Sequence, residues 1–243
     1  MRITTIVSAA LAIVLSTAAF ATPSLSGPTG GTNLPDATVS ALHNGQIADD
    51  FMMGSNHNAM VLRGVYGIAT DLEVGVAGYF DTGKHGSDNN GIGINAKYQL
   101  ANLGLQNGDK VAVGINYQDT SGSFNDTSIY LVGTRQVTEM NMSRPAVAAS
   151  VGLNYNTAPH STILRPYASV DATYSGGLNL NAEIQFGGSD YDNQPMMALT
   201  ARFPINNTWA VQAGYTNSNL GTYGTNSGGL ILGTSCKFNT TPR

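Results

Sequence analysis

The chain has 243 residues, its formal net charge is −4, and only 11% of its residues are charged. Hydrophobic residues make up 42% of the chain, which argues against a disordered protein. Lys and Arg are not in excess, so the composition argues against a nucleic-acid-binding protein. The single cysteine, Cys236, excludes an intramolecular disulfide and a metal site built from several cysteines.

The first 21 residues have the features of a secretory signal peptide. Arg2 supplies a positive charge, residues 3–20 form an apolar stretch, and Ala19-Phe20-Ala21 is a small-x-small cleavage site. An uncleaved membrane anchor is the alternative, but such a helix needs about 20 apolar residues and this stretch is marginal in length. We therefore predict that residues 1–21 are removed after Ala21 and that the mature chain is exported.

The mature chain alternates apolar and polar residues with the period of two that is typical of β-strands. In the clearest segment, Leu180, Ile184 and Phe186 are interleaved with Asn, Glu and Gln side chains. No segment after residue 21 has the period of a helix. Twelve strands are predicted, at residues 45–54, 59–68, 72–80, 91–100, 109–118, 127–136, 146–156, 163–174, 178–187, 196–203, 208–216 and 228–238.

Two of these strands depart from the simple pattern. In the first, Asp49 shares a face with Ile47 and Phe51, and in the sixth either face could be the apolar one. Outside the strands, we expect residues 22–44 to form a periplasmic or plug segment and residues 239–243 to form a C-terminal tail.

The length and number of the strands indicate a membrane barrel. A tilted strand that spans a bilayer needs about 9–11 residues, whereas strands of soluble proteins most often have about 5–6. Most of the predicted strands are in the longer class, and bacterial outer-membrane barrels have an even number of strands. We therefore predict an all-β fold, a single transmembrane, antiparallel, up-and-down β-barrel of about 12 strands at residues 45–238. A soluble sandwich or barrel is the alternative.

The aromatic residues of the apolar face support the membrane interpretation, because they occur at strand ends. With both termini in the periplasm, they form two girdles at the two bilayer interfaces. This arrangement predicts that the protein lies in the bacterial outer membrane, with membrane lipid and, during biogenesis, the barrel-assembly machinery as partners. The predicted outer girdle is Phe80, Tyr117, Tyr155, Phe186 and Tyr215, and the inner girdle is Tyr66, Tyr98, Tyr174, Phe203, Trp209 and Phe238.

Large polar side chains occur on the opposite face of the strands and are predicted to line the lumen. An Arg or Lys that faced lipid at mid-depth would cost roughly 2–4 kcal/mol. In the hairpin joined by residues 81–90, facing residues have numbers that sum to about 171, so Glu73 and Lys97 should form an ion pair. The predicted lining comprises Arg63, Glu73, Lys97, Arg165, Tyr167, Asp171, Glu183, Arg202 and Lys237.

No catalytic, metal or cofactor site is predicted. The histidines at positions 43, 57, 85 and 160 all fall in connecting segments or before the first strand, where the rigid geometry of a catalytic triad is not expected. The oxygen-rich clusters at residues 88–90 and 190–193 supply too few ligands for calcium. Cys236 is expected to be inert on the apolar face.

The N-terminal part of the mature chain resembles a family of bacterial outer-membrane proteins. The residues that carry the resemblance are Gly27-Pro28-Thr29-Gly30, Pro35-Asp36-Ala37, Gly45, Tyr66-Gly67-Ile68 and Asp71-Leu72-Glu73-Val74-Gly75. They are similar to the Gly-x-Thr-Gly, Pro-x-Ala and Gly pattern of YjbH-like barrels and of related uncharacterised small barrels. The resemblance covers residues 22–80 and implies a link to exopolysaccharide biosynthesis.

Three functions are compatible with these observations. The favoured one is an envelope-structural protein or a narrow passive pore for a small solute of unknown identity, because a barrel of twelve strands is narrower than the open porins of sixteen or eighteen. The second is an accessory protein in the biosynthesis or export of an exopolysaccharide. The third, an outer-membrane hydrolase, is disfavoured by the placement of the histidines, so we expect a protein that is not an enzyme.

Overall fold

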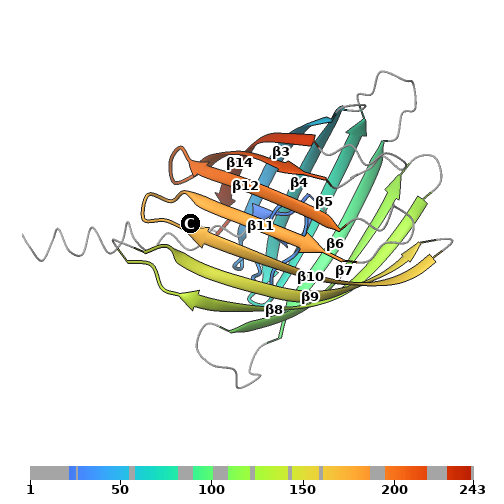
Figure 1. Cartoon of the computed structure of the whole chain (residues 1–243), viewed down its shortest axis with the longest axis horizontal. Coiled ribbons are helices and arrows are strands. Elements are labelled where there is room, and N and C mark those ends of the chain that lie inside the picture. Colours follow the sequence, from blue (N-terminus) through green and yellow to red (C-terminus); the bar gives the residue numbers. More distant parts are fainter. Residues whose placement is uncertain are drawn as a thin grey trace, which may run out of the picture.

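Twelve antiparallel strands close into a single barrel in the computed structural model of the protein (Figure 1). The structure describes residues 22–25, 27–54, 58–81, 90–100, 109–120, 124–141, 144–158, 161–186, 195–217 and 229–241. Among these residues, no helix is long and apolar enough to cross a membrane. The signal peptide predicted at residues 1–21 lies outside the described residues.

Each barrel strand pairs with its neighbours in sequence, and β14 pairs with β3 to close the ring. The largest difference from the predicted bounds is at β8, which begins at Phe124 instead of 127. The fold predicted from the sequence is therefore confirmed. The strands of the barrel are β3 (Asn44–Gly54), β4 (Asn58–Ala69), β5 (Leu72–Asp81), β6 (Gly91–Gln99), β7 (Lys110–Thr120), β8 (Phe124–Thr138), β9 (Ala146–Ala158), β10 (Ser161–Thr173), β11 (Asn179–Gln185), β12 (Met196–Pro204), β13 (Trp209–Thr216) and β14 (Gly229–Asn239).

The apolar face of the strands lies on the outside of the barrel. Val151 and Leu199 are 66% and 63% exposed, whereas their neighbours Ser150 and Thr200 are 2% and 7% exposed. A soluble barrel has the opposite polarity, because its apolar face forms the core. An outward apolar belt of this kind is typical of transmembrane barrels, which turn that face to lipid.

The structure places all eleven predicted girdle residues on this outer surface. Near the end of the barrel where β3 begins and β14 ends, which we call the inner end, Tyr66 and Phe238 stack with ring centroids 6.3 Å apart and an interplanar angle of 10°. Next to them, the Tyr66 hydroxyl lies 2.5 Å from the Thr240 hydroxyl, and the Thr240 N–H donates to the carbonyl of His43 at 2.9 Å. These contacts hold Thr240 against the barrel. Thr240 belongs to residues 239–243, which the sequence predicts to be a C-terminal tail.

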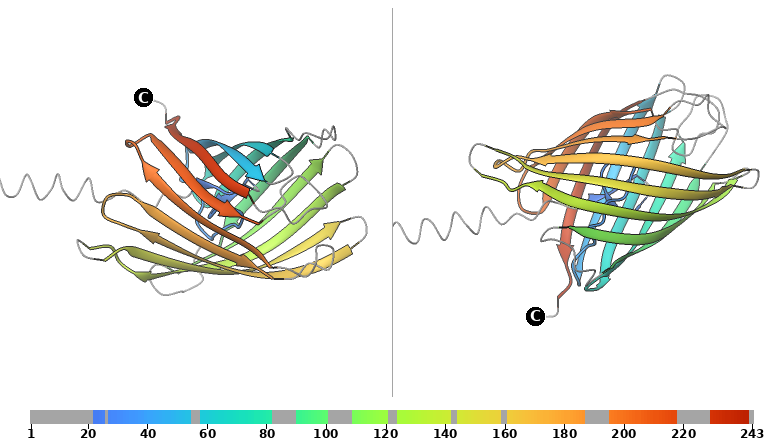
Figure 2. Two further views of the ribbon diagram at one scale, coloured as in Figure 1. Left: turned by 45° about the horizontal axis from the view of Figure 1, so that its top comes forward. Right: turned by 60° about the horizontal axis from the view of Figure 1, so that its bottom comes forward.

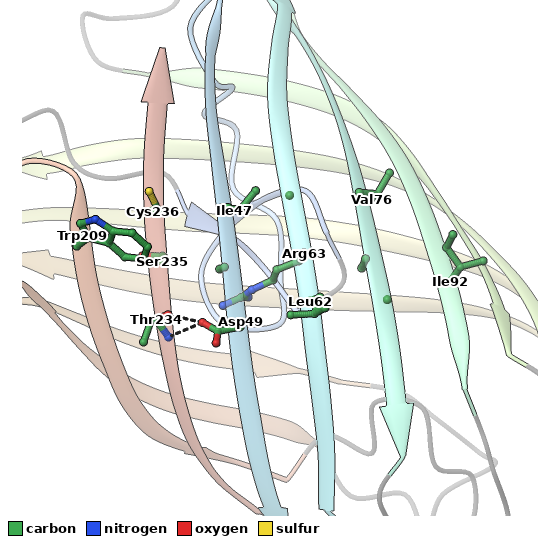
Figure 3. A pocket seen from close by; sticks show the side chains of 14 residues that line it. Ile47, Asp49, Leu62, Arg63, Val76, Ile92, Trp209, Thr234, Ser235 and Cys236 are labelled. Atoms are coloured by element: carbon green, nitrogen blue, oxygen red, sulfur yellow. Dashed lines mark hydrogen bonds between the residues drawn. The ribbon is translucent and has the colours of Figure 1, made fainter. Parts of the chain in front are cut away.

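The two neighbouring aspartates of β3 point to opposite sides of the barrel wall. Asp50 faces the lumen, where it forms an ion pair with Arg63 and accepts a hydrogen bond from Gln212. Asp49 faces outward, as its position between Ile47 and Phe51 predicts, and accepts a hydrogen bond from Thr234 (Figure 3).

The surface around Asp49 is hollowed. The hollow has a volume of about 680 Å³ and lies on the outer face of β3–β6, β13 and β14 (Figure 3). Gly64 and Gly78 contribute no side chains to it, and its lining is mostly apolar, with Trp209 and Cys236 at one end. Cys236 thus lies on the apolar face, where the sequence places it.

The segment that precedes the barrel lies inside it. Residues 22–43 contain a short hairpin of β1 (Thr22–Pro23) and β2 (Thr29–Gly30), which the sequence pattern did not predict. Leu25 is fully buried and Leu34 is 3% exposed. The blue N-terminal segment is enclosed by the ring of strands in the views of Figure 2. We call residues 22–43 the plug.

The opposite orientations of Asp49 and Asp50 give a test of the fold. Replacing Asp49 with Val removes a carboxylate from the lipid face and should raise the free energy of unfolding by about 1 kcal/mol. Replacing Asp50 with Val leaves the Arg63 guanidinium buried without its partner and should lower that free energy by about 3–5 kcal/mol.

Urea unfolding of the two variants in lipid vesicles measures both effects. Equal destabilisation by the two substitutions would contradict the assigned faces of β3.

Candidate functional site

The plug is anchored to the barrel by a buried ion pair on β5 and β6. Glu73 and Lys97 face each other in the register of the two strands, as the sum of their residue numbers predicts. Both side chains are fully buried, and Glu73 Oε1 lies 3.1 Å from Lys97 Nζ. Burying two charges is costly unless their hydrogen-bonding groups are also satisfied. The groups that surround this ion pair therefore determine whether it stabilises the fold.

Main-chain groups of the plug supply the missing hydrogen bonds of the ion pair. The N–H groups of Thr29 and Ser40 each donate to the Glu73 carboxylate at 2.8 Å. Lys97 Nζ donates to the carbonyls of Thr29 at 2.7 Å and of Asp36 at 3.1 Å. The ion pair therefore binds both donors and acceptors of a chain segment that has almost no regular secondary structure of its own.

Asp36 adds a third charge to this anchor. Its Oδ1 lies 3.7 Å from Lys97 Nζ and accepts a hydrogen bond from the N–H of Thr38 at 2.8 Å. Burial raises the pKa of the Asp36 carboxyl, and the nearby Lys97 ammonium opposes that shift. Lys97 thus lies between two carboxylates, one from the barrel and one from the plug.

The other side of the plug is held by residues of β11, β12 and β13. The Asn33 N–H donates to Glu183 Oε2 at 2.8 Å, and its side-chain amide donates to the Thr216 hydroxyl at 3.1 Å. The hydroxyls of Thr32 and Thr200 are 2.7 Å apart. Since β5 and β6 are separated from β11–β13 along the ring in both directions, the plug bridges two separate sectors of the barrel wall.

Two apolar clusters complete the contact between plug and barrel. Leu25 packs with Met52, Val61, Ala77, Tyr79 and Ile231, and the Tyr79 hydroxyl donates to the carbonyl of Leu25 at 3.1 Å. The second cluster is centred on two plug residues and two inward tyrosines, and it consists of Leu34, Ala37, Ala112, Tyr130, Val132 and Tyr167, with Met196 packed against it.

The second cluster is also hydrogen-bonded. Tyr167 donates to the carbonyl of Pro35 at 3.2 Å, and the Ala37 N–H donates to the Thr134 hydroxyl at 2.9 Å. The plug is thus fixed by charge, hydrogen bonds and apolar contacts together.

Two glycines allow this close fit. A Cβ atom at Gly31 would overlap the carboxylate of Glu183, and one at Gly27 would overlap the side chain of Asn95. Gly27 also has a φ of 109°, a conformation that other residues rarely adopt. A side chain at either position fits only if the wall side chain or the plug itself shifts.

The structure places the nine predicted lumen residues on the inner face of the barrel. Arg63, Glu73, Lys97, Tyr167 and Glu183 are buried, and Arg165, Asp171, Arg202 and Lys237 are half-buried. Arg202 Nη2 donates to Gln212 Oε1 at 3.1 Å, so it joins the network of Asp50 and Arg63.

Three parts of this site are not predicted by the sequence pattern. Asp50 has no clear signal because the neighbouring Asp49 interrupts the alternation of β3. Tyr130 has none because both faces of β8 contain apolar residues. The plug contacts have no periodic signal, and only the density of Gly, Pro and Thr in residues 27–37 could have drawn attention to them.

Several residues that the sequence offers for catalysis or metal binding lie outside the described residues. They are His57, His85, His160, Asp88, Asn89 and residues 190–193. His43 has a φ of 64° at the junction of plug and β3, and its Nδ1 lies 3.4 Å from the Tyr66 hydroxyl. Within the described ranges, no group of three or more His, Cys, Asp or Glu side chains could hold a metal ion.

Comparison with solved structures identifies the fold. The chain is similar to KdgM porin, with 14% identity and a TM-score of 0.62 over 80% of this chain and 99% of that one. It is also similar to NanC porin (11% identity, TM-score 0.58, 80% and 100% coverage) and to the outer membrane protein Omp33 of Acinetobacter baumannii (11%, 0.57, 81% and 98%). No protein-family model and no curated protein matches the chain. The protein therefore has the fold of outer-membrane, porin-like β-barrels.

The anchor predicts strong energetic coupling between Glu73 and Lys97. Replacing Glu73 with Gln leaves the buried Lys97 with only the more distant Asp36 carboxylate, and replacing Lys97 with Met leaves Glu73 without a cation. Each change should therefore lower the free energy of unfolding by about 3–5 kcal/mol. In the double variant, the free energy of unfolding should fall by clearly less than the sum of the decreases in the two single variants. A double-mutant cycle measured by urea unfolding in vesicles tests this expectation.

The pair formed by Arg135 and Asp109 is the control. It lies at the exposed inner end of the barrel, with 2.6 Å between Nη2 and Oδ2, and should show much weaker coupling. Strict additivity at Glu73 and Lys97 would contradict the anchor.

Proposed function

We propose that the protein is a narrow outer-membrane pore that its own N-terminal segment keeps closed. The observation that carries this proposal is the double attachment of the plug, to Glu73 and Lys97 on one sector of the wall and to Glu183 on another. A segment bound at both places obstructs the path of a solute along the lumen. Conduction then requires the plug to shift or leave.

Two of the structural neighbours, KdgM and NanC, are described as porins, which supports a pore. For this chain we propose a passive, non-enzymatic role without a cofactor. We further propose that residues 1–21 are a leader removed after Ala21, that the barrel-assembly machinery inserts the mature chain, and that outer-membrane lipid surrounds it. Mass spectrometry of the protein from isolated outer membranes tests the location and the N-terminus at Thr22.

A second candidate function is an accessory role in the biosynthesis or export of an exopolysaccharide. The observation that favours it is spatial: Thr29, Asp36 and Glu73, which belong to separate parts of the resemblance to YjbH-like barrels, meet at the plug anchor. If that resemblance reflects kinship, the anchor is the feature that the proteins share. Deleting the gene should then reduce the amount of secreted polysaccharide, and an unchanged amount would eliminate this candidate.

The closed-pore proposal predicts that loosening the plug opens the channel. Replacing Gly31 with Leu places a side chain against Glu183 and should shift the equilibrium away from the seated plug by at least about 1.4 kcal/mol, which is a tenfold rise in open probability. Single-channel recording in planar bilayers should show little or no conductance for the wild type and frequent openings for this variant.

A matched glycine provides the control. Gly176 lies in the turn between β10 and β11, and a Cβ there would have no atom within 4 Å, so Gly176→Leu should conduct like the wild type. A barrel without residues 22–41 should be permanently open. If neither the Gly31→Leu variant nor the deletion conducts more than the wild type, the protein is not a plugged pore.

A further inference from the structure

The hollow on the outer face of β3–β6, β13 and β14 contains a charged side chain. Of the charged side chains that the structure describes, only Asp49 faces outward between the two aromatic girdles. Asp119 also faces outward but follows Tyr117 of the outer girdle, and Arg135 lies at the inner end beside Asp109. The hollow and the one charge of the apolar belt therefore occur at the same place.

The depth of Asp49 follows from the register of its neighbours. Tyr66 of the inner girdle lies opposite Gly45, and Phe80 of the outer girdle lies in the same row of the register as Phe51. Asp49 lies between Gly45 and Phe51 in β3, and thus between the two interfaces. Because lipid headgroups lie at the level of the girdles, they do not reach this carboxylate.

The contacts of Asp49 engage only one oxygen of its carboxylate. Asp49 Oδ1 accepts hydrogen bonds from the N–H of Thr234, at 3.2 Å, and from the Thr234 hydroxyl. Among the described residues, no further hydrogen bond and no ion pair involves Asp49. A charged side chain that faces lipid between the interfaces costs free energy, and such groups normally have a partner. The barrel supplies only part of one here.

The size and lining of the hollow suit an apolar ligand. Its volume of about 680 Å³ lies in the range of ligand pockets, roughly 300–1,000 Å³. Gly64 and Gly78 leave its floor free of side chains, and Trp209 and Ile92 lie at opposite ends of it (Figure 3). The apolar side chains between these ends are Ile47, Leu62 and Val76.

One acidic group in an apolar hollow matches an apolar molecule that carries one ammonium group. An ammonium forms a charge-assisted hydrogen bond with a carboxylate, which is stronger than the hydrogen bond of a neutral hydroxyl. The acyl chains of lipids can fill the apolar part of the hollow, but they offer no donor to Asp49. An apolar amine supplies both the apolar surface and the donor.

We propose that this hollow binds an apolar amine, with the ammonium at Asp49 and the apolar part against the side chains between Trp209 and Ile92. The site lies on the outside of the barrel wall. The inference therefore goes beyond the proposed function and does not depend on the plug or on conduction.

Photolabelling of the mature protein in phosphatidylcholine vesicles tests the inference. The probes are a dodecylamine with a diazirine in its chain and the matching dodecanol, and mass spectrometry quantifies the label on each strand. On the strands that line the hollow, we expect the amine to label at least about tenfold more than the alcohol, because its hydrogen bond to Asp49 is charge-assisted. On β9 and β10, which do not line the hollow, the two probes should label equally.

Two variants remove the two features of the site separately. Asp49→Asn keeps an acceptor for Thr234 and removes the charge, so the amine should label no more than the alcohol does. Gly64→Leu fills the hollow and should also abolish the excess labelling by the amine. A Cβ at Gly64 would lie 3.5 Å from Ile47 Cγ2 and 3.6 Å from the carbonyl oxygen of Gln46, which are ordinary contacts, so the wall need not shift.

A matched glycine outside the hollow provides the control. Gly133 on β8 does not line the hollow, and the nearest atom to a Cβ there would be the carbonyl oxygen of Lys110 at 3.9 Å. Gly133→Leu should therefore be labelled like the wild type. Heat-dependent gel migration confirms that each variant is folded before labelling.

The inference is overturned if amine and alcohol label the hollow of the wild type equally, if Asp49→Asn retains the preference for the amine, or if Gly133→Leu loses it as Gly64→Leu does. Two other occupants are outcomes of the same experiment, and either would also overturn it. Loss of the excess labelling when phosphatidylethanolamine replaces phosphatidylcholine indicates that a lipid headgroup occupies the hollow. Loss as the density of protein in the vesicles rises indicates that a second copy covers it.

Discussion

The constraint on which the structure depends is that polar main-chain groups enclosed by a barrel must find hydrogen-bond partners. The strands satisfy theirs by pairing around a closed ring. The plug has only a short hairpin, so its N–H and carbonyl groups depend on the side chains of the wall. Glu73 accepts hydrogen bonds from two of its N–H groups and Lys97 donates to two of its carbonyls, which makes these charges part of the plug's folding rather than of a transport path.

The same constraint explains why charged residues can be buried in this lumen. A buried ion pair is costly when its remaining hydrogen-bonding groups are unsatisfied, and stable when they are satisfied. Around Glu73 and Lys97 the plug fulfils that condition. Around Asp50 and Arg63 the condition is met only in part. Gln212 donates to Asp50 and Arg202 donates to Gln212, but apart from its ion pair with Asp50 the buried Arg63 guanidinium has no hydrogen-bond partner among the described residues. Among the described residues, Glu73 with Lys97 and Asp50 with Arg63 are thus local pairs of opposite charge.

The anchor is thus charged, fully buried and occupied by the protein's own chain. The tyrosines at positions 130 and 167 contact the plug in the apolar cluster with Leu34 and Ala37. Charge and apolar packing therefore hold the same segment in the lumen.

The sequence by itself determined the barrel, because each strand carries its own signals. The period of two, the strand length and the aromatic residues at strand ends all indicate a membrane-spanning strand. It also determined the pairing of Glu73 with Lys97, since a hairpin register is fixed by its connection. Only the tertiary structure decided that residues 22–43 lie inside the barrel, that Thr29 and Asn33 are bound to distant strands, and that Asp50 faces Arg63. The plug contacts join residues far apart in the chain through single main-chain groups, which leave no periodic signal in a sequence. Asp50 and Arg63 are side chains on neighbouring strands, but they are offset in the register and do not lie directly opposite each other.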